Sequence, residues 1–132
     1  MSASPGNTPG NTGSGASMGR RLSALVVNYR SGAFAVGCVQ SLLREWEREG
    51  RDRADLEVVV VDNDSPTDET AFLAELEELG ARVVLSDVNG GYAGGMNLAY
   101  AETRGGPDDV VAILNPDLCF LPGSVGGLMD WL

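Results

Sequence analysis

Four apolar segments of the sequence are each followed by asparagine or aspartate, and these are the side chains best suited to chemistry. Asn28 follows the first segment, Asp62 the second, Asn89 the third and Asp117 the fourth. Carboxylates accept strong hydrogen bonds from N–H and hydroxyl groups, and hard oxygen ligands suit divalent cations. The recurrence predicts a polar site assembled from four separate segments. Asn and Asp also start turns and cap helices, so a structural role is the alternative for each residue.

The second segment ends in Val-Asp-Asn-Asp-Ser (residues 61–65). A carboxylate fixed at this point can accept a hydrogen bond from a pyrimidine N–H or from a ribose hydroxyl, and Asp62 is the candidate for that contact. The alternative for Asp62 is a cap on the helix that follows, and the same alternative applies to Asp64.

The third motif, Asn-Gly-Gly-Tyr-Ala-Gly-Gly-Met-Asn (residues 89–97), has four glycines in six residues. Glycine carries no Cβ atom, so a ligand can approach the backbone, and amide N–H groups at a helix N-terminus attract anions. A nucleotide could lie against such a turn. The motif does not match G-x-G-x-x-G, and a flexible loop is the alternative interpretation.

The fourth motif is Asn115-Pro116-Asp117, in which proline holds the two flanking side chains in an extended turn. Asp117 is the candidate ligand of a divalent cation. A diphosphate about 4 Å from a carboxylate is repelled by roughly 1 kcal/mol per charge pair in water and about 4 kcal/mol at an effective dielectric near 20. An acidic pocket without lysine therefore requires Mg²⁺ or Mn²⁺ to hold a diphosphate. An ordinary turn is the alternative.

Lysine and histidine are both absent, and 9 arginines face 19 acidic residues, for a net charge of −10. These absences exclude a P-loop lysine, a Schiff-base amine, a Ser-His or Cys-His pair and a histidine-ligated metal. The acidic charge argues against non-specific binding to nucleic acid or to anionic membranes. Arg30 is the one base placed near the polar motifs, where it either contacts phosphate or is exposed. Cys38 and Cys119 are interpreted as small core residues in a reducing, cytoplasmic setting.

Regular elements must position these residues, and the apolar segments have the composition of buried strands. They cover residues 22–27, 56–61, 82–85 and 110–114, and their starts are 34, 26 and 28 residues apart. Continuous Val, Leu and Ile is typical of strands covered on both faces, and the spacing matches strand-helix-strand units. We therefore predict an α/β fold, a Rossmann-like parallel sheet of about four strands with flanking helices on both faces. Such sheets bind ligands outside the carboxyl ends of their strands.

The segments between the predicted strands have apolar residues at helical spacing. Ser31 is the predicted N-cap of the first helix. Its predicted buried stripe consists of Phe34, Cys38, Leu42 and Trp46. The second helix is predicted to start with Ser65 as cap and Asp68 completing a capping box. A third helix is expected over about residues 93–104, with Met96, Ala99, Tyr100 and Thr103 on one face, and a fourth near Ser124.

The first 20 residues are interpreted as a disordered leader, because 14 of the first 17 are Gly, Ser, Thr, Asn or Pro and none is charged. The folding unit is predicted to span residues 21–132. Translation is expected to start at Met18 or at Met1. No apolar run reaches the length of about 20 residues that spans a bilayer, and the amino terminus lacks the order of a signal peptide.

Four motifs occur in a fixed order: Val-Val-Asn-Tyr (26–29), Val-Asp-Asn-x-Ser (61–65), Asn-x-Gly-Tyr-Ala-Gly-Gly-x-Asn (89–97) and Leu-Asn-Pro-Asp (114–117). Together they resemble the N-terminal half of family 2 glycosyltransferases, and the Asn-Pro-Asp version looks most like the rhamnosyltransferase branch. The resemblance covers nearly everything from Leu22 onward. It implies a GT-A type domain that binds a nucleotide-diphosphate sugar with Mn²⁺ or Mg²⁺ and transfers the sugar with inversion.

The resemblance also implies site residues. It assigns nucleotide-sugar contacts to Asn28, Tyr29, Asp62, Asn89, Gly91, Tyr92, Gly94, Gly95, Asn97 and Asn115. It assigns the metal to Asp117. The implied donor is dTDP-L-rhamnose, with UDP-galactofuranose or another UDP-sugar as competitors. The implied acceptor is a glycan or lipid-linked hydroxyl of a cell-envelope or surface polysaccharide, and the expected location is the cytoplasm, at the inner face of the membrane for the full-length protein.

Three positions depart from the family pattern. Asn115 stands where many relatives have an aspartate, the acid expected after Ser65 comes one position late at Asp68, and Ala99 replaces a frequent glycine. The general base of the family lies in a second half, beyond Leu132. Residues 21–132 are therefore expected to be an incomplete domain that binds the donor without turning it over.

Two other interpretations stay open. The chain could be a truncated, non-catalytic module that binds nucleotide sugars, and its unpaired sheet edge would favour self-association. Asp62-x-Asp64 after a run of valines is also similar to aspartyl-nucleophile phosphatases. Those enzymes expect a threonine two residues after the second Asp, whereas Thr67 comes one residue late, and they use a lysine that this chain lacks.

Overall fold

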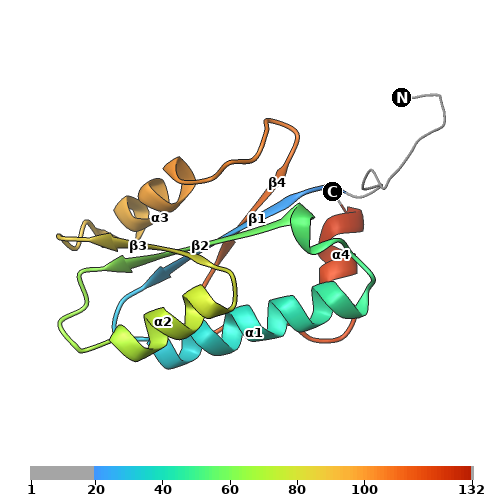
Figure 1. Cartoon of the computed structure of the whole chain (residues 1–132). Helices are drawn as coiled ribbons and strands as arrows, with labels where there is room; N and C mark the ends of the chain where they lie inside the picture. The colour runs from blue at the N-terminus through green and yellow to red at the C-terminus, as the bar shows by residue number, and fades with distance from the viewer. Residues whose placement is uncertain (1–19, 132) are drawn as a thin grey trace.

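The computed structural model describes residues 20–131 as a four-stranded sheet flanked by four helices (Figure 1). The strands are β1 (Leu22–Asn28), β2 (Leu56–Asn63), β3 (Arg82–Ser86) and β4 (Val110–Leu114). The helices are α1 (Gly32–Arg48), α2 (Thr70–Glu78), α3 (Gly91–Ala101) and α4 (Ser124–Trp131), and a short 3₁₀ turn, η1 (Arg53–Asp55), precedes β2. The predicted fold class and strand segments are confirmed. The predicted leader and Met18 lie outside the described residues, apart from Arg20.

The four strands are parallel and lie in the order β3-β2-β1-β4. The chain builds the sheet outward from β1 to β3 and then returns to add β4 on the other side of β1. The reversal makes the crevice between β1 and β4 the switch point at which open α/β sheets bind ligands. In-register pairing places Asn28 opposite Asp62 and Asn63 opposite Ser86, so the polar strand ends lie side by side.

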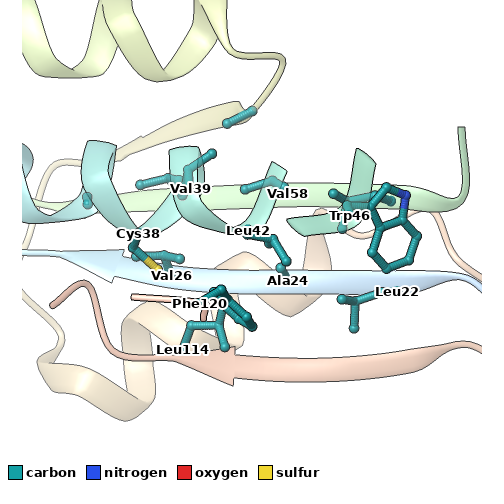
Figure 2. Packing of buried hydrophobic residues seen from close by; sticks show 14 of the residues in the cluster. Leu22, Ala24, Val26, Cys38, Val39, Leu42, Trp46, Val58, Leu114 and Phe120 are labelled. Carbon is teal, nitrogen blue, oxygen red and sulfur yellow. The ribbon is translucent and has the colours of Figure 1, made fainter. Parts of the chain in front are cut away.

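Helices cover both faces of the sheet (Figure 1). α1, α2 and α4 contribute to the core on one face, where Figure 2 shows Cys38 and Leu42 of α1 beside Val26 and Ala24 of β1, and Trp46 toward Leu22. α3 covers the opposite face. Its Met96 and Ala99 join a second apolar cluster with alternate residues of β1 and β2, namely Leu25, Val27, Val59 and Val61. Because successive strand residues point to opposite faces, two covered faces require the continuous apolar runs of β1 and β2.

The edge strands β3 and β4 differ from the prediction that all four strands are covered on both faces. α3 packs on β1 and β2, so on its side of the sheet Val111 and Ile113 of β4 remain exposed, Ile113 by 60%. Leu85 near the end of β3 is also exposed. Apolar surface on an edge strand favours association. Self-association through this edge stays a prediction.

α2 begins at Thr70, five residues after its predicted cap. The Ser65 hydroxyl donates to Asp62 Oδ1 at 2.7 Å instead of capping a helix, which corrects the prediction. Asp68 Oδ1 accepts the N–H of Thr70 at 3.0 Å and so satisfies one of the donors that a helix leaves free at its start. Hydrogen bonds from Thr70, its side chain first and then its backbone, hold the pKa of Asp68 below its usual value.

Two aromatic residues of the predicted helical faces are exposed. Phe34, in the first turn of α1, is 64% exposed, whereas the other three residues of that stripe are buried as predicted. Tyr100 of α3 is exposed as well. α3 starts at Gly91 and ends at Ala101, two and three residues earlier than predicted. Among residues 20–131, no helix combines the length and the apolar character that crossing a membrane requires.

Candidate functional site

A pocket of about 680 Å³ opens at the carboxyl ends of the strands and beside the start of α3. Six of the predicted site residues line it, namely Tyr29, Asn89, Gly91, Tyr92, Asn115 and Asp117. The remaining lining residues are Val27, Ser31, Phe34, Asn63 and Pro116. All four polar motifs therefore contribute to one pocket, as expected of parallel strands that end at a common edge.

Asp62 does not line this pocket. It is 8% exposed, and its Oδ1 accepts hydrogen bonds from Asn28 Nδ2 at 2.9 Å and from Ser65 Oγ at 2.7 Å. Its Oδ2 accepts the N–H of Ser65 at 3.2 Å. Asn28 is fully buried, and its Oδ1 accepts from both the N–H and the hydroxyl of Ser31. In this arrangement the two residues hold the turns that follow β1 and β2, and their contact with a nucleotide stays a prediction.

Asn63 lines the pocket although it was not among the predicted site residues. Its Nδ2 donates to Asn89 Oδ1 at 2.9 Å and to the Gly91 carbonyl at 3.0 Å. Since a backbone carbonyl can only accept, these bonds fix the orientation of the amide. The side chain is 2% exposed, and its Oδ1 has no hydrogen-bond partner. A buried amide oxygen without a donor is costly, but this oxygen is closed to solvent, so a ligand would reach it only after a local movement of the pocket wall.

The glycine-rich motif forms the turn into α3. Gly91 has φ +79, a left-handed conformation in which glycine is favoured. Asn89 Oδ1 accepts the N–H of Gly91 at 2.9 Å while also accepting from Asn63. The turn is thus fixed by side chains of its own and of β2. The alternative interpretation of this motif as a flexible loop is therefore disfavoured.

The other predicted residues of this motif lie outside the pocket lining. Gly95 is buried, and a Cβ atom at this position would lie 2.9 Å from both γ carbons of Val27, so the glycine allows α3 to pack closely on β1. Gly94 has no neighbour within 4 Å of such an atom. Asn97 is exposed on α3. Their contacts with a nucleotide sugar stay predictions.

The Asn-Pro-Asp motif faces the start of α3 across the pocket. The hydroxyl of Tyr92 donates to Asn115 Oδ1 at 3.3 Å, and the Asp117 side chain is exposed. Among residues 20–131 no cluster of three potential metal-binding side chains occurs. Proteins often hold Mg²⁺ by one or two carboxylates, with substrate phosphates as further ligands of the ion. The Asp117 carboxylate and the Asn115 amide oxygen therefore fit Mg²⁺ or Mn²⁺ together with a bound diphosphate.

The pocket lining carries a single formal charge, that of Asp117, and includes no basic side chain. Arg30, which the sequence placed near this edge, is exposed and lies outside the lining. An anionic ligand in this pocket would therefore find no cationic side chain to balance its charge. A cation bound by Asp117 would provide that balance.

Two aromatic residues, Tyr29 and Phe34, form what we call the aromatic wall of the pocket. Tyr29 comes from the turn after β1, and Phe34 from the first turn of α1. Tyr29 is 42% exposed and Phe34 is 64% exposed. Exposed aromatic rings in a pocket are suited to stacking against a flat ligand such as a nucleobase, which contributes about 1–3 kcal/mol per base.

The two cysteines differ in environment. Cys38 is buried as predicted, but Cys119 is exposed, because it follows the Asn-Pro-Asp turn before the chain re-enters the core at Phe120. Burial, and after it the charges of Cys119 and Asp117, raise the pKa of the Cys38 thiol to about 11.

Iodoacetamide at pH 8 is expected to alkylate Cys119 and to leave Cys38 intact, because the thiolate is the reactive form and Cys38 is buried and protonated. Mass spectrometry of the labelled chain measures this, and denaturant should expose both thiols to the reagent. Equal labelling of Cys38 in the folded chain would contradict the assignment.

The pKa of Cys38 in the folded chain lies above its ordinary value of 9.0, so folding favours the protonated thiol. The contribution of this thiol to the free energy of unfolding is therefore complete below pH 9 and should be lost as the pH rises toward 11.

Comparison with known proteins finds one matching family model and several solved structures of similar fold. The family model described as glycosyl transferase family 2 matches residues 23–132. Residues 1–349 of TarS from S. aureus match with a TM-score of 0.69 and 20% identity, covering 84% of this chain and 32% of that one. The mannosyltransferase PcManGT of Pyrobaculum calidifontis, solved with GDP-Man and Mn²⁺, matches with a TM-score of 0.68 and 22% identity, covering 86% and 32%.

The TarS structure in complex with UDP also matches, with a TM-score of 0.61 and 22% identity, covering 74% of this chain and 27% of that one. The chain thus spans between about a quarter and a third of the length of these structures. At such identities the likeness shows the fold. No curated protein gives a significant match to the sequence.

Proposed function

Because the chain belongs to glycosyl transferase family 2, we propose that its pocket binds the nucleotide diphosphate of an activated sugar. The chain then supplies the donor-binding part of a glycosyltransferase. The proposed reaction is the inverting transfer of the sugar to an acceptor hydroxyl of a cell-envelope or surface polysaccharide. The proposed donor is dTDP-L-rhamnose, and UDP-galactofuranose or another UDP-sugar is the alternative.

The single observation that carries this proposal is a pocket with one carboxylate, Asp117, and no basic side chain. Without a cation, a diphosphate about 4 Å from Asp117 would be repelled by roughly 1 to 4 kcal/mol per charge pair. Asp117 would hold Mn²⁺ or Mg²⁺, and Asn115 offers a further hard oxygen in the same pocket. The cation, when bound, supplies charge neutralisation of the departing diphosphate. A protein of similar fold, solved with GDP-Man and Mn²⁺, supports this proposal.

The nucleobase is proposed to lie between the aromatic wall and Asn63. Stacking on Tyr29 or Phe34 would hold any base, because every base has a π face. Asn63 Oδ1 would accept an N–H from the edge of the base. Uracil and thymine each present an imide N–H, and both belong to the proposed donors.

Transfer to a hydroxyl also needs a general base that removes its proton. Among the described residues that line the pocket, Asp117 is the one carboxylate, and we assign it to the metal. The chain is therefore proposed to bind the donor without turning it over. Incubation with dTDP-rhamnose, Mn²⁺ and acceptor glycan should release no dTDP above the buffer background, and clear release would refute this part of the proposal.

Calorimetric titration with UDP, dTDP, GDP and ADP, each with and without Mn²⁺, tests the donor-binding function. We expect binding of UDP and dTDP that depends on Mn²⁺. Failure of all four diphosphates to bind in the presence of Mn²⁺ would refute the proposed function. Tight binding of ADP alone would refute the assignment of the base.

Replacing Asn63 with alanine is expected to weaken UDP binding about tenfold, because the acceptor for the base is lost and the Asn89 turn loses two hydrogen bonds. Asp64→Asn is the matched control, since Asp64 is the next residue, is exposed and lies outside the pocket lining. Calorimetry of both variants at equal Mn²⁺ measures the effect. Wild-type affinity in Asn63→Ala would remove Asn63 from the site.

A further inference from the structure

Glu69 is a buried carboxylate outside the pocket lining, and no role proposed above uses it. It directly precedes α2. Its Oε1 accepts the N–H of Gly32 at 2.8 Å and Asn28 Nδ2 at 3.2 Å, and its Oε2 accepts the Thr67 hydroxyl at 3.1 Å. Both oxygens are thus engaged, by donors from separate segments of the chain.

The bond to Gly32 joins Glu69 to the start of α1. Gly32 is the first residue of that helix, and its N–H is one of the donors that a helix leaves free at its N-terminus. A negative charge at this point is also favoured by the helix dipole. Gly32 packs closely against Phe72 of α2, because a Cβ atom added to it would lie 2.6 Å from the Phe72 side chain. The start of α1 is therefore fixed by contact and by hydrogen bond together.

The turn between β1 and α1 depends on the same group of contacts. Arg30 in this turn has φ +59, a left-handed conformation that is unfavourable for a residue other than glycine. Such a conformation persists where surrounding contacts over-determine it. Here the Arg30 N–H donates to Ser65 Oγ at 2.9 Å, and Asn28 holds Ser31. Glu69 holds the far end of the turn at Gly32 and also contacts Asn28.

The aromatic wall lies on either side of these anchored positions. Tyr29 directly precedes Arg30, and Phe34 lies two residues after Gly32. A displacement of Gly32 would shift both rings relative to the pocket. Asp117, in contrast, follows β4 in a different segment of the chain. The contacts of Glu69 therefore affect the end of the pocket that carries the aromatic wall. They do not reach the end that carries Asp117, where the metal is proposed to bind.

We propose that Glu69 is a positioning residue that holds the aromatic wall in the place where it receives the nucleobase. The proposal rests on the proposed nucleotide-binding function. Glu69 acts through the Gly32 N–H and through Asn28, and it has no contact with the nucleotide itself. An acceptor atom at Oε1 is the property that this role requires, so glutamine should replace glutamate and alanine should not.

Hydrogen-deuterium exchange and calorimetry of the whole chain test the proposal. In Glu69→Ala, exchange over residues 29–34 should rise at least tenfold while exchange in β1 and β2 stays at the wild-type rate. Affinity for UDP with Mn²⁺ should fall about tenfold. Glu69→Gln keeps the acceptor but removes the charge that the helix dipole favours, so both measurements should lie nearer to wild type than to Glu69→Ala. Glu77→Ala and Glu77→Gln are matched controls, since Glu77 is an exposed glutamate of α2.

Three results would overturn the inference: wild-type UDP affinity in Glu69→Ala, faster exchange that spreads through β1 and β2, or failure of Glu69→Gln to restore binding. The second result would show that Glu69 stabilises the fold as a whole. A wild-type chain that binds no UDP would refute the proposed function instead. Exchange over residues 29–34 needs no ligand, so it would still decide whether Glu69 fixes the turn that carries the wall.

Discussion

Replacing Asp117 with asparagine is expected to abolish the Mn²⁺ dependence of UDP binding and to weaken binding in Mn²⁺ at least about 100-fold. Asparagine keeps the shape of the side chain but removes the one formal charge of the pocket lining. The cation then loses its protein carboxylate, and the diphosphate loses the charge that balances it. Asn115 alone offers a neutral oxygen, which is a much weaker ligand for a hard cation.

Stability should change little in this variant, because the Asp117 side chain is exposed. Calorimetric titration of UDP at several Mn²⁺ concentrations, with EDTA as the metal-free reference, measures the effect. Asp108→Asn is the matched control. It removes the same charge from an exposed position in the connection that precedes β4, at the opposite end of that strand. Metal-dependent binding that survives in Asp117→Asn would show that another group holds the cation.

Replacing Gly95 with alanine is expected to lower the free energy of unfolding by about 1–3 kcal/mol. The added methyl group would lie 2.9 Å from both γ carbons of Val27, and valine has little freedom to turn away. Val27 is buried between the sheet and α3, so the helix itself must move outward. Because α3 also carries Gly91 and Tyr92 of the pocket, UDP affinity should fall together with stability.

Gly94→Ala is the matched control for stability, since it adds the same methyl group one residue earlier in the same helix. A Cβ atom at Gly94 meets no neighbour within 4 Å. Alanine is the better helix former, so this variant should gain about 0.5–1 kcal/mol. Urea denaturation of the two variants side by side gives the comparison. Equal stabilities would show that the packing of α3 on β1 tolerates a side chain at position 95.

The strands were predictable because their signal is local. Continuous Val, Leu and Ile in β1 and β2 reflects two covered faces, and both strands are buried along nearly their whole length. The same reasoning failed for β4, whose composition is equally apolar. Its exposed face depends on how far α3 reaches across the sheet, and this distance is a property of packing rather than of the segment itself.

Helix starts were predicted less well, because several residues near a helix can serve as its cap. Ser65 has the right chemistry to cap α2, but Asp62 binds its hydroxyl, and the helix starts at Thr70. Phe34 fits the buried stripe of α1 by its spacing. It nevertheless lines the pocket, because the first turn of α1 reaches the carboxyl end of the sheet, where the ligand site lies.

Sequence alone determined the parallel α/β fold, the family and the meeting of four polar motifs in one pocket, because strand composition is local and parallel strands end at the same edge. Only the tertiary structure decided which of two adjacent residues of β2, Asp62 or Asn63, lines that pocket. Asp62 and Asn63 point to opposite faces of the sheet, and the position of α3 puts Asn63 toward the pocket while Asp62 joins Asn28 and Ser65. The role of Glu69 was equally hidden, because its contact with Asn28 spans 41 residues of sequence. Contacts of that range are set by the packing of α1 and α2 on the sheet, which no local pattern records.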